Sequence, residues 1–86
     1  MTHVKTSSGF EMDVDELMFN DMELFDCVAE VEKGHMLSLS EVVTRVVGDK
    51  RAEFYDSLRK EDGRVPVDDV MSQVMEIIQQ AGGKNS

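Results

Sequence analysis

The sequence lacks most of the features on which secreted and membrane proteins depend. It contains no Trp, one Tyr, one Pro and a single cysteine, Cys27. One cysteine excludes an internal disulfide and is compatible with a reducing compartment. The first residues, MTHVKTSSG, include no apolar segment of a secretory signal, and no run of apolar residues is long enough to span a membrane. We therefore expect one soluble, intracellular domain.

Positive charge is also scarce. The sequence contains nine Lys and Arg and 18 Asp and Glu, which gives a net charge of −9. Binding to nucleic-acid backbones or to anionic membranes requires a basic surface. We therefore expect no nucleic acid and no membrane among the partners, and instead a basic or aggregation-prone protein.

Reactive side chains occur singly. His3 and His35 have no partner at metal-ligand spacing, and no base is recognisable for Cys27, which we interpret as a buried structural thiol. The acidic pairs Asp13/Asp15 and Asp68/Asp69 are typical of helix starts and solvated faces, and no glycine-rich phosphate loop occurs. We expect a protein that is not an enzyme and holds no metal or cofactor.

Residues 61–69 resemble the second half of an EF-hand loop. Aligning Gly63 with the glycine of that loop places Leu58 and Lys60 at the first and third ligand positions, where carboxylates are needed. Calcium binding is therefore not expected, and a calcium-independent EF-hand relative is kept as a third interpretation.

Residues 65–81 carry the clearest helical pattern in the chain. Apolar residues at 67, 70, 71, 74, 77, 78 and 81 form one stripe. Pro66 suits the first helical position, and Asp68 and Asp69 favour the positive end of the helix dipole. Gly82 and Gly83 predict a left-handed end to this helix.

Three further helices are predicted upstream. The first begins at Asn20, or earlier at Asp13 or Asp15, carries a stripe of Leu24, Phe25, Val28 and Val31, and ends at Gly34. The second runs from Ser38 to Gly48, and the third from Asp49 to about residue 61, with Ala52, Phe54, Tyr55 and Leu58 as its apolar members. The predicted fold class is all-α: a small bundle of about four helices with an extended N-terminal arm.

The arm comes from residues 10–15, which alternate apolar and acidic side chains. It either lies across the helices or forms an edge that pairs with another chain, because no second strand is visible in the sequence. Residues 1–9 are predicted to be a flexible start, residues 10–81 one helical domain, and residues 82–86 a flexible tail.

Two segments carry a family resemblance. FEMDVDELMFNDMELFDCVAEV is similar to the opening of small tailed-phage tail assembly chaperones, with the pattern F-x-x-D-x-x-x-L-x-F-x-D/E. EDGRVPVDDVMSQVMEII, followed by GGKNS, is similar to their closing segment in phages or prophages of Gram-positive bacteria. The resemblance covers roughly residues 10–86.

The resemblance implies a function without catalysis. Such proteins bind the long, hydrophobic tape-measure protein, keep it soluble, and help tail-tube subunits to polymerise around it. They act in the host bacterial cytoplasm and are absent from the finished particle. Self-association is a further expectation.

Methionine-rich surfaces adapt to partners without one fixed sequence. Met71 and Met75 are assigned to the core, because Met at helical spacing is more often buried than partner-binding. The predicted partner-binding surface lies between residues 10 and 22, which are more apolar than four short helices can cover; it comprises Phe10, Met12, Val14, Met18, Phe19 and Met22.

The alternative function is an acidic helical adaptor, or an inhibitor that mimics DNA, binding one folded partner. A DNA mimic concentrates Asp and Glu on one face, whereas acidic residues occur here in every segment.

The C-terminal sequence permits a second product. Gly82-Gly83-Lys84-Asn85 can be encoded by a message on which ribosomes slip back by one base. Phages of this type often make a rarer, extended chaperone by such a frameshift. We therefore expect either a minor longer form or simply a polar C-terminus.

Overall fold

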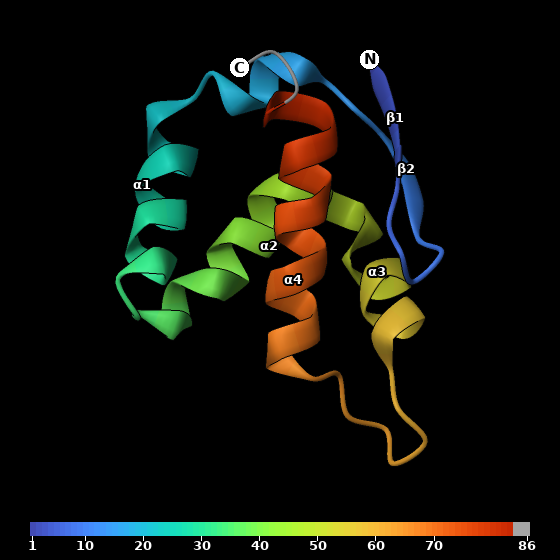
Figure 1. The fold of residues 1–86 in the computed structure, drawn as a ribbon. Helices are drawn as coiled ribbons and strands as arrows, with labels where there is room; N and C mark the ends of the chain where they lie inside the picture. Colours follow the sequence, from blue (N-terminus) through green and yellow to red (C-terminus); the bar gives the residue numbers. More distant parts are fainter. Residues whose placement is uncertain (84–86) are drawn as a thin grey trace.

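The computed structural model describes residues 1–83 (Figure 1). Within these residues the chain forms one two-stranded antiparallel hairpin and four α-helices, joined by short 3-10 turns. The expected mainly helical character is confirmed. The all-α prediction is wrong at the N-terminus, where the arm is one half of a hairpin.

The hairpin consists of β1 (Thr2–Lys5) and β2 (Glu11–Val14). Thr2 pairs with Val14, and Val4 pairs with Met12. Residues 1–9 are therefore not a flexible start, because they supply a strand and the turn that follows it. Val4 and Val14 are both 0% exposed, so the inner face of this small sheet is part of the core.

The hairpin is tied to the C-terminal half of α4 (Val67–Ile78). The amide of Lys5 donates to the side chain of Gln80 (3.2 Å), whose own amide group donates back to the Lys5 carbonyl (2.8 Å). The amide of Ser7 donates to Glu76 (2.7 Å). These bonds cover part of the outer edge of β1. The arm thus has a strand partner within the chain, β1, whereas pairing with another chain stays a prediction.

The first helix, α1, spans Met22–Glu32 and follows a 3-10 turn, η1, over Glu16–Phe19. Asp21, not Asn20, caps α1, its carboxylate accepting the amide of Glu23 (2.9 Å). Gly34 ends the segment as predicted. Its φ of +98° permits hydrogen bonds from its own amide and from that of His35 to the last turn of the helix.

The remaining helices begin and end slightly differently from the predictions. The second, α2, covers Leu39–Val47 and stops at Gly48, whereas α3 covers Arg51–Leu58 and ends before residue 61. Pro66 precedes the first residue of α4 instead of occupying it. A π-helical turn over Gln79–Gly83 continues α4, and Gly82 does not adopt the predicted left-handed conformation. Residues 84–86 of the predicted tail lie outside the described residues.

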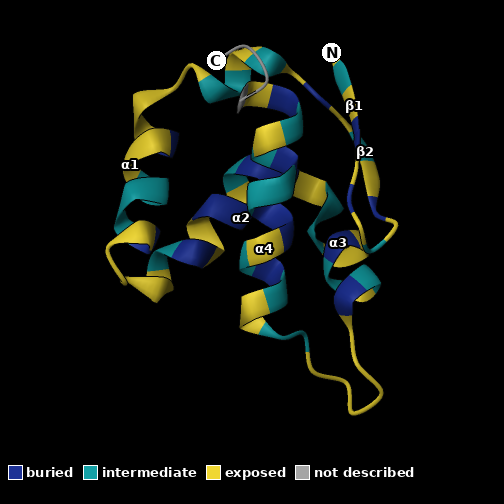
Figure 2. Ribbon diagram, in the orientation of Figure 1, coloured by how far each residue is buried: buried dark blue, intermediate teal, exposed yellow. Residues whose placement is uncertain are grey.

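The core lies where α4, α2, α3 and the hairpin meet (Figure 2). Phe54 of α3 is 0% exposed, and the ring of Phe10 packs edge-on against it at 5.1 Å between centroids. The buried side chains are mostly aliphatic and come from every helix and both sides of the hairpin; the least exposed are Phe54, Ile77, Val4, Val14, Val43, Val46 and Val74.

Candidate functional site

The structure divides the six residues of the predicted partner-binding surface. Phe10 is 5% exposed and Val14 is 0% exposed, so both are core residues and are removed from that surface. The alternation of residues 10–15 did predict one buried face, but that face packs inside the molecule. Met12, Met18 and Phe19 are half-buried against the core, and Met22 is 67% exposed.

An apolar groove lies between α1 and α4, with α2 beneath it. Its upper part has a volume of about 230 Å³, and its lower part is a small recess of about 10 Å³; the two share Val28 as a wall residue. One ionisable side chain, Glu32, is among those that line it. We call it the α1–α4 groove; its other lining residues are Phe19, Leu24, Phe25, Val31, Leu39, Val42, Met71, Val74, Met75, Ile78 and Gly82.

The rim of this groove is apolar and open to solvent. Phe25 is 65% exposed, although the sequence placed it in the buried stripe of α1. At the upper end the ring of Phe19 packs against Gly82, where an added Cβ would lie 2.8 Å from the Phe19 Cγ atom. Glycine is therefore required there for the chain to approach this ring. Met75 lines the lower part instead of being buried, whereas Met71 packs against the core as predicted.

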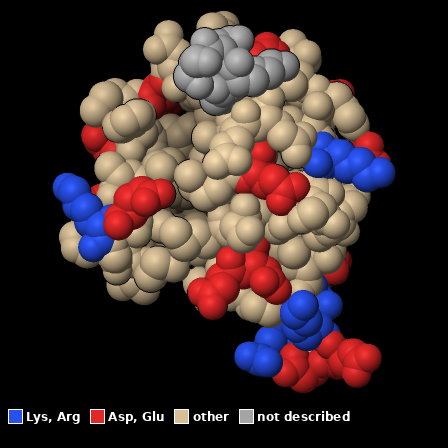
Figure 3. Space-filling view, viewed as in Figure 1, with Lys and Arg blue, Asp and Glu red and all other residues tan. Residues whose placement is uncertain are grey.

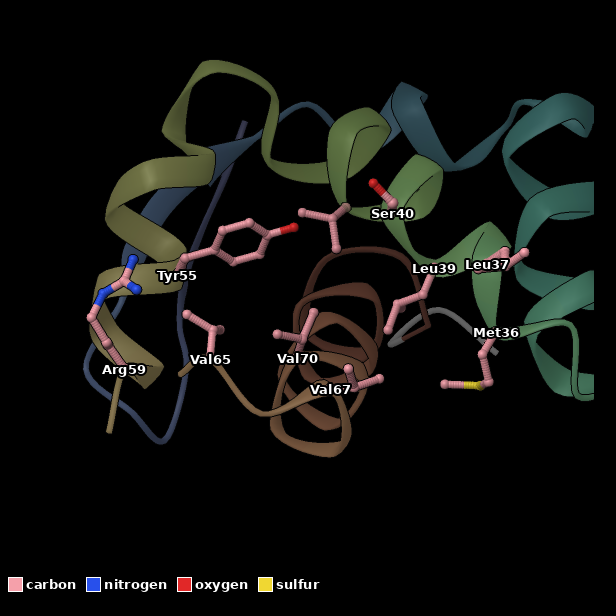
Figure 4. A pocket seen from close by; sticks show the side chains of 10 residues that line it. Met36, Leu37, Leu39, Ser40, Tyr55, Arg59, Val65, Val67 and Val70 are labelled. Carbon is pink, nitrogen blue, oxygen red and sulfur yellow. The ribbon is translucent and has the colours of Figure 1, made fainter. Parts of the chain in front are cut away.

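A second apolar groove lies between the start of α2, α3 and the first turn of α4 (Figure 4). Its volume is about 470 Å³. Leu37 is 97% exposed at its edge and Val67 is 56% exposed. The ring of Tyr55 and the side chain of Val70 point into it (Figure 4). We call it the α2–α3 groove; its lining residues are Met36, Leu37, Leu39, Ser40, Val43, Tyr55, Arg59, Val65, Val67 and Val70.

The sequence did not identify the α2–α3 groove. One signal was present: Met36 and Leu37 follow Gly34 in a connection between two helices, where polar residues are usual. Exposed apolar residues in such a connection indicate either burial by another element or a partner. The structure shows that Leu37 is covered by no other element.

The net charge of the molecule is concentrated in one segment. Residues 11–32, which form β2, η1 and α1, contain nine Asp and Glu and no Lys or Arg. The other nine acidic residues are balanced by the nine Lys and Arg of the chain. The net charge of −9 therefore belongs to a segment that includes α1, one wall of the α1–α4 groove; five of its nine acidic residues are Asp21 and the four of α1.

The exposed face of the hairpin holds a histidine between two carboxylates. His3 Nδ1 lies 2.8 Å from Asp13, and His3 Nε2 lies 2.8 Å from Glu11. Ionised carboxylates only accept hydrogen bonds, so both contacts are satisfied together when the imidazole is protonated. Hydrogen bonds to Glu11 and then to Asp13 accordingly raise the pKa of His3 above its ordinary value of 6.5.

This arrangement predicts a pH-dependent stability. Because the pKa of His3 is raised in the folded state, its contribution is fully present below pH 6.5, the ordinary value, and is lost as the pH rises through the folded-state pKa. We expect urea midpoints to fall as the pH rises above about 6.5. His3→Gln should remove this dependence, and an unchanged slope in that variant would show that another group causes it.

Cys27 has little nucleophilic character. The side chain is half-buried on α1. Burial, followed by a hydrogen bond to Glu41, raises the pKa of the thiol above its usual range and keeps it protonated. Among the described residues, no group of three or more His, Cys, Asp and Glu is placed to hold a metal ion.

No helix within residues 1–83 combines the length and the apolar character needed to cross a membrane. Comparison of the chain with protein-family models, with curated proteins and with solved structures gave no match.

Proposed function

We propose that this protein is a non-catalytic tail assembly chaperone that binds apolar segments of a tape-measure protein. The observation that carries the proposal is the pair of open apolar grooves in an 86-residue chain with a net charge of −9. Apolar grooves on a small helical domain suit amphipathic helices of a partner. The excess negative charge keeps both the free protein and its complexes soluble.

The side chains in these grooves suit a client of variable sequence. Met36 lines the α2–α3 groove, and Met71 and Met75 line the α1–α4 groove. Met fills irregular spaces because its side chain is unbranched and flexible. The family resemblance of residues 10–86 supplies the identity of the client, and the grooves supply a physical means of holding it.

Further parts of the proposal follow from the same resemblance. The protein would act in the host bacterial cytoplasm before the tail is complete, recruit tail-tube subunits, and be absent from the virion. Self-association through a groove and a longer, frameshifted form also remain predictions. The longer form would continue the chain near Lys84, Asn85 and Ser86. These three residues lie outside the described residues.

An acidic adaptor or inhibitor of one folded partner is the alternative, and the concentration of charge in residues 11–32 favours it. Within that segment, however, Met22 and Phe25 are about two-thirds exposed. A surface that imitates DNA should present acidic groups without large apolar side chains between them. A DNA mimic is therefore disfavoured, and the alternative that is left is an adaptor that binds its partner through the same grooves.

The proposal predicts that co-expression keeps the tape-measure protein of the same phage in the soluble fraction. Removing one exposed apolar side chain from each groove, in the double variant Phe25→Ser/Leu37→Ser, should abolish most of this effect. Each side chain is more than half exposed in the free protein, so the variant should remain folded. The measurement is the soluble fraction of tape-measure protein after centrifugation.

Leu17→Ser is the matched control, because Leu17 is 73% exposed but lines neither groove. It should solubilise the client as well as the parent protein does. A parent protein that leaves the client insoluble would refute the chaperone function. A stoichiometric complex with a different, folded protein would favour the adaptor.

A further inference from the structure

We propose that the α1–α4 groove binds a cationic amphipathic helix, a segment with one apolar stripe flanked by Lys and Arg. In the cell this segment would belong to the tape-measure client, and in that respect alone the inference rests on the proposed function. The inference also distinguishes the two grooves from each other. Both are apolar, but the charged residues beside them differ.

The walls of the groove are long enough to contact a helix of about three turns. Its walls are α1, with 11 residues, and α4, with 12 residues. At 1.5 Å per residue each wall is about 16–18 Å long. The two helices run alongside each other, and α2 lies behind them (Figure 1). Leu39 and Val42 of α2 form the floor of the lower part.

The walls carry the side chains that a helix with an apolar stripe would contact. Phe25 and Val28 project from α1, and Met75 and Ile78 project from α4. Phe25 has most of its surface in water in the free protein, so covering it is favourable by the hydrophobic effect. The flexible Met71 and Met75 allow side chains of different size to be accepted.

Neither wall contains a positive charge. Residues 11–32 and residues 65–83, which include all of α1 and α4, have no Lys or Arg. On α1, Asp21 precedes Phe25 by four residues and Glu32 follows Val28 by four, so these carboxylates continue the same stripe at both ends. Figure 3 shows red patches beside the tan surface between α1 and α4, with blue atoms at its outer margins.

Two cations close to α1 do not offset its charge. Arg45 of α2 is engaged by Glu41 at 3.0 Å and lies 3.9 Å from Glu23. Glu23 is two residues from Phe25, a rotation of about 200° around the helix, which places it on the opposite face of α1. Lys33 follows α1 directly and lies beyond Glu32 at the lower end.

The α2–α3 groove differs in charge. Arg59 lines it and is paired with Asp56 at 3.0 Å, and Lys60 and Arg64 of the adjoining connection are paired with Asp69 and Asp62. Because acidic and basic groups are balanced there, an incoming Lys or Arg gains less than it does beside α1. We therefore expect the preference for a cationic helix to be stronger in the α1–α4 groove, and a variant in the other groove provides an internal control.

The test uses three synthetic helices of about 14 residues with the same Leu stripe and with Lys, Gln or Glu on the polar face. Fluorescence anisotropy gives their dissociation constants with the full chain. We expect the Lys peptide to bind at least about tenfold more tightly than the Gln peptide. The Glu peptide should not bind measurably. Raising the salt from about 50 to 500 mM should reduce the advantage of Lys over Gln severalfold.

Two pairs of variants separate groove binding from unspecific attraction to an acidic protein. Phe25→Gln preserves every charge and should weaken the Lys peptide by about tenfold or more. Leu37→Gln makes a comparable change in the other groove and should leave the affinity unaltered. Asp21→Asn/Glu32→Gln should reduce the preference for Lys over Gln, and Asn at position 21 can still cap α1. Asp56→Asn/Glu61→Gln, which removes two charges from α3 and the connection that follows it, should reduce the preference less.

Equal affinity for the three peptides, or sensitivity to Leu37→Gln without sensitivity to Phe25→Gln, would overturn the inference. Failure of all three peptides to bind would do the same. These outcomes are distinct from failure of the proposed function. A protein that binds the Lys peptide through Phe25 but leaves the tape-measure protein insoluble would retain this groove assignment and lose the chaperone role.

Discussion

Phe54→Ala should unfold the protein at a much lower temperature than the parent. Phe54 is 0% exposed and packs against the ring of Phe10 at 5.1 Å, with Tyr55 at 6.1 Å. Truncating a buried Phe to Ala removes its apolar burial and leaves a cavity, at a cost of about 3–5 kcal/mol. For a domain of this size the melting temperature should fall by at least about 12 °C. Thermal denaturation followed by circular dichroism measures this change.

The same substitution at Phe25 is the matched control. Phe25 is 65% exposed, so Phe25→Ala removes the same atoms from the surface and should cost less than about 1 kcal/mol. Equal destabilisation by the two variants would show that Phe25 of α1 is more deeply buried than it is in the structure. A small effect at Phe54 alone would show that the contact between α3 and the hairpin does not form.

The helices could be predicted because their information is local. Gly34 and Gly48 end α1 and α2 as expected, and the apolar stripe of residues 67–81 identifies α4. The predicted ends of α3 and α4 were less accurate, and further errors lie at the starts of helices. Ser38 and Pro66 precede their helices without a capping side-chain hydrogen bond. At these positions packing against other elements determines where the helix begins, and the local sequence pattern does not reveal that packing.

The hairpin could not be predicted in the same way. The four residues of β1 contain one buried apolar side chain, Val4, which is too weak a signal to identify a strand. The strand is specified by distant residues: Val14 pairs with Thr2, and Gln80 and Glu76 of the C-terminal region bind the backbone of Lys5 and Ser7. Such contacts become visible only when residues 12 to 75 positions apart are brought together.

The candidate site was only partly accessible from sequence for a related reason. Alternation of residues 10–15 identified Phe10 and Val14 as apolar positions of one face, but not whether that face meets a partner or the molecule's own core. Phe25 shows the converse, because helical spacing placed it in a buried stripe that α4 leaves uncovered. A groove depends on the distance between two helices, and the sequence of either helix alone does not determine that distance.

Deleting residues 1–9 should strongly destabilise the protein, although the sequence predicts a flexible start. The deletion removes β1 and with it the fully buried Val4, and it uncovers Val14. Losing one buried Val costs about 1.5–3 kcal/mol, and exposing its partner adds to this. Loss of the backbone bonds to Gln80, Glu76 and Gln73 adds about 1 kcal/mol for each.

The expected total, about 4 kcal/mol or more, is a large part of the stability of a small domain. Urea denaturation of the shortened chain should therefore show a midpoint far below that of the parent, or no folded baseline. Lys5→Gln is the matched control within β1, because its side chain is exposed while its backbone bonds to Gln80 remain; it should change the stability by less than about 0.5 kcal/mol. If the shortened chain were as stable as the parent, residues 1–9 would have to be interpreted as a flexible start, and the hairpin would be refuted.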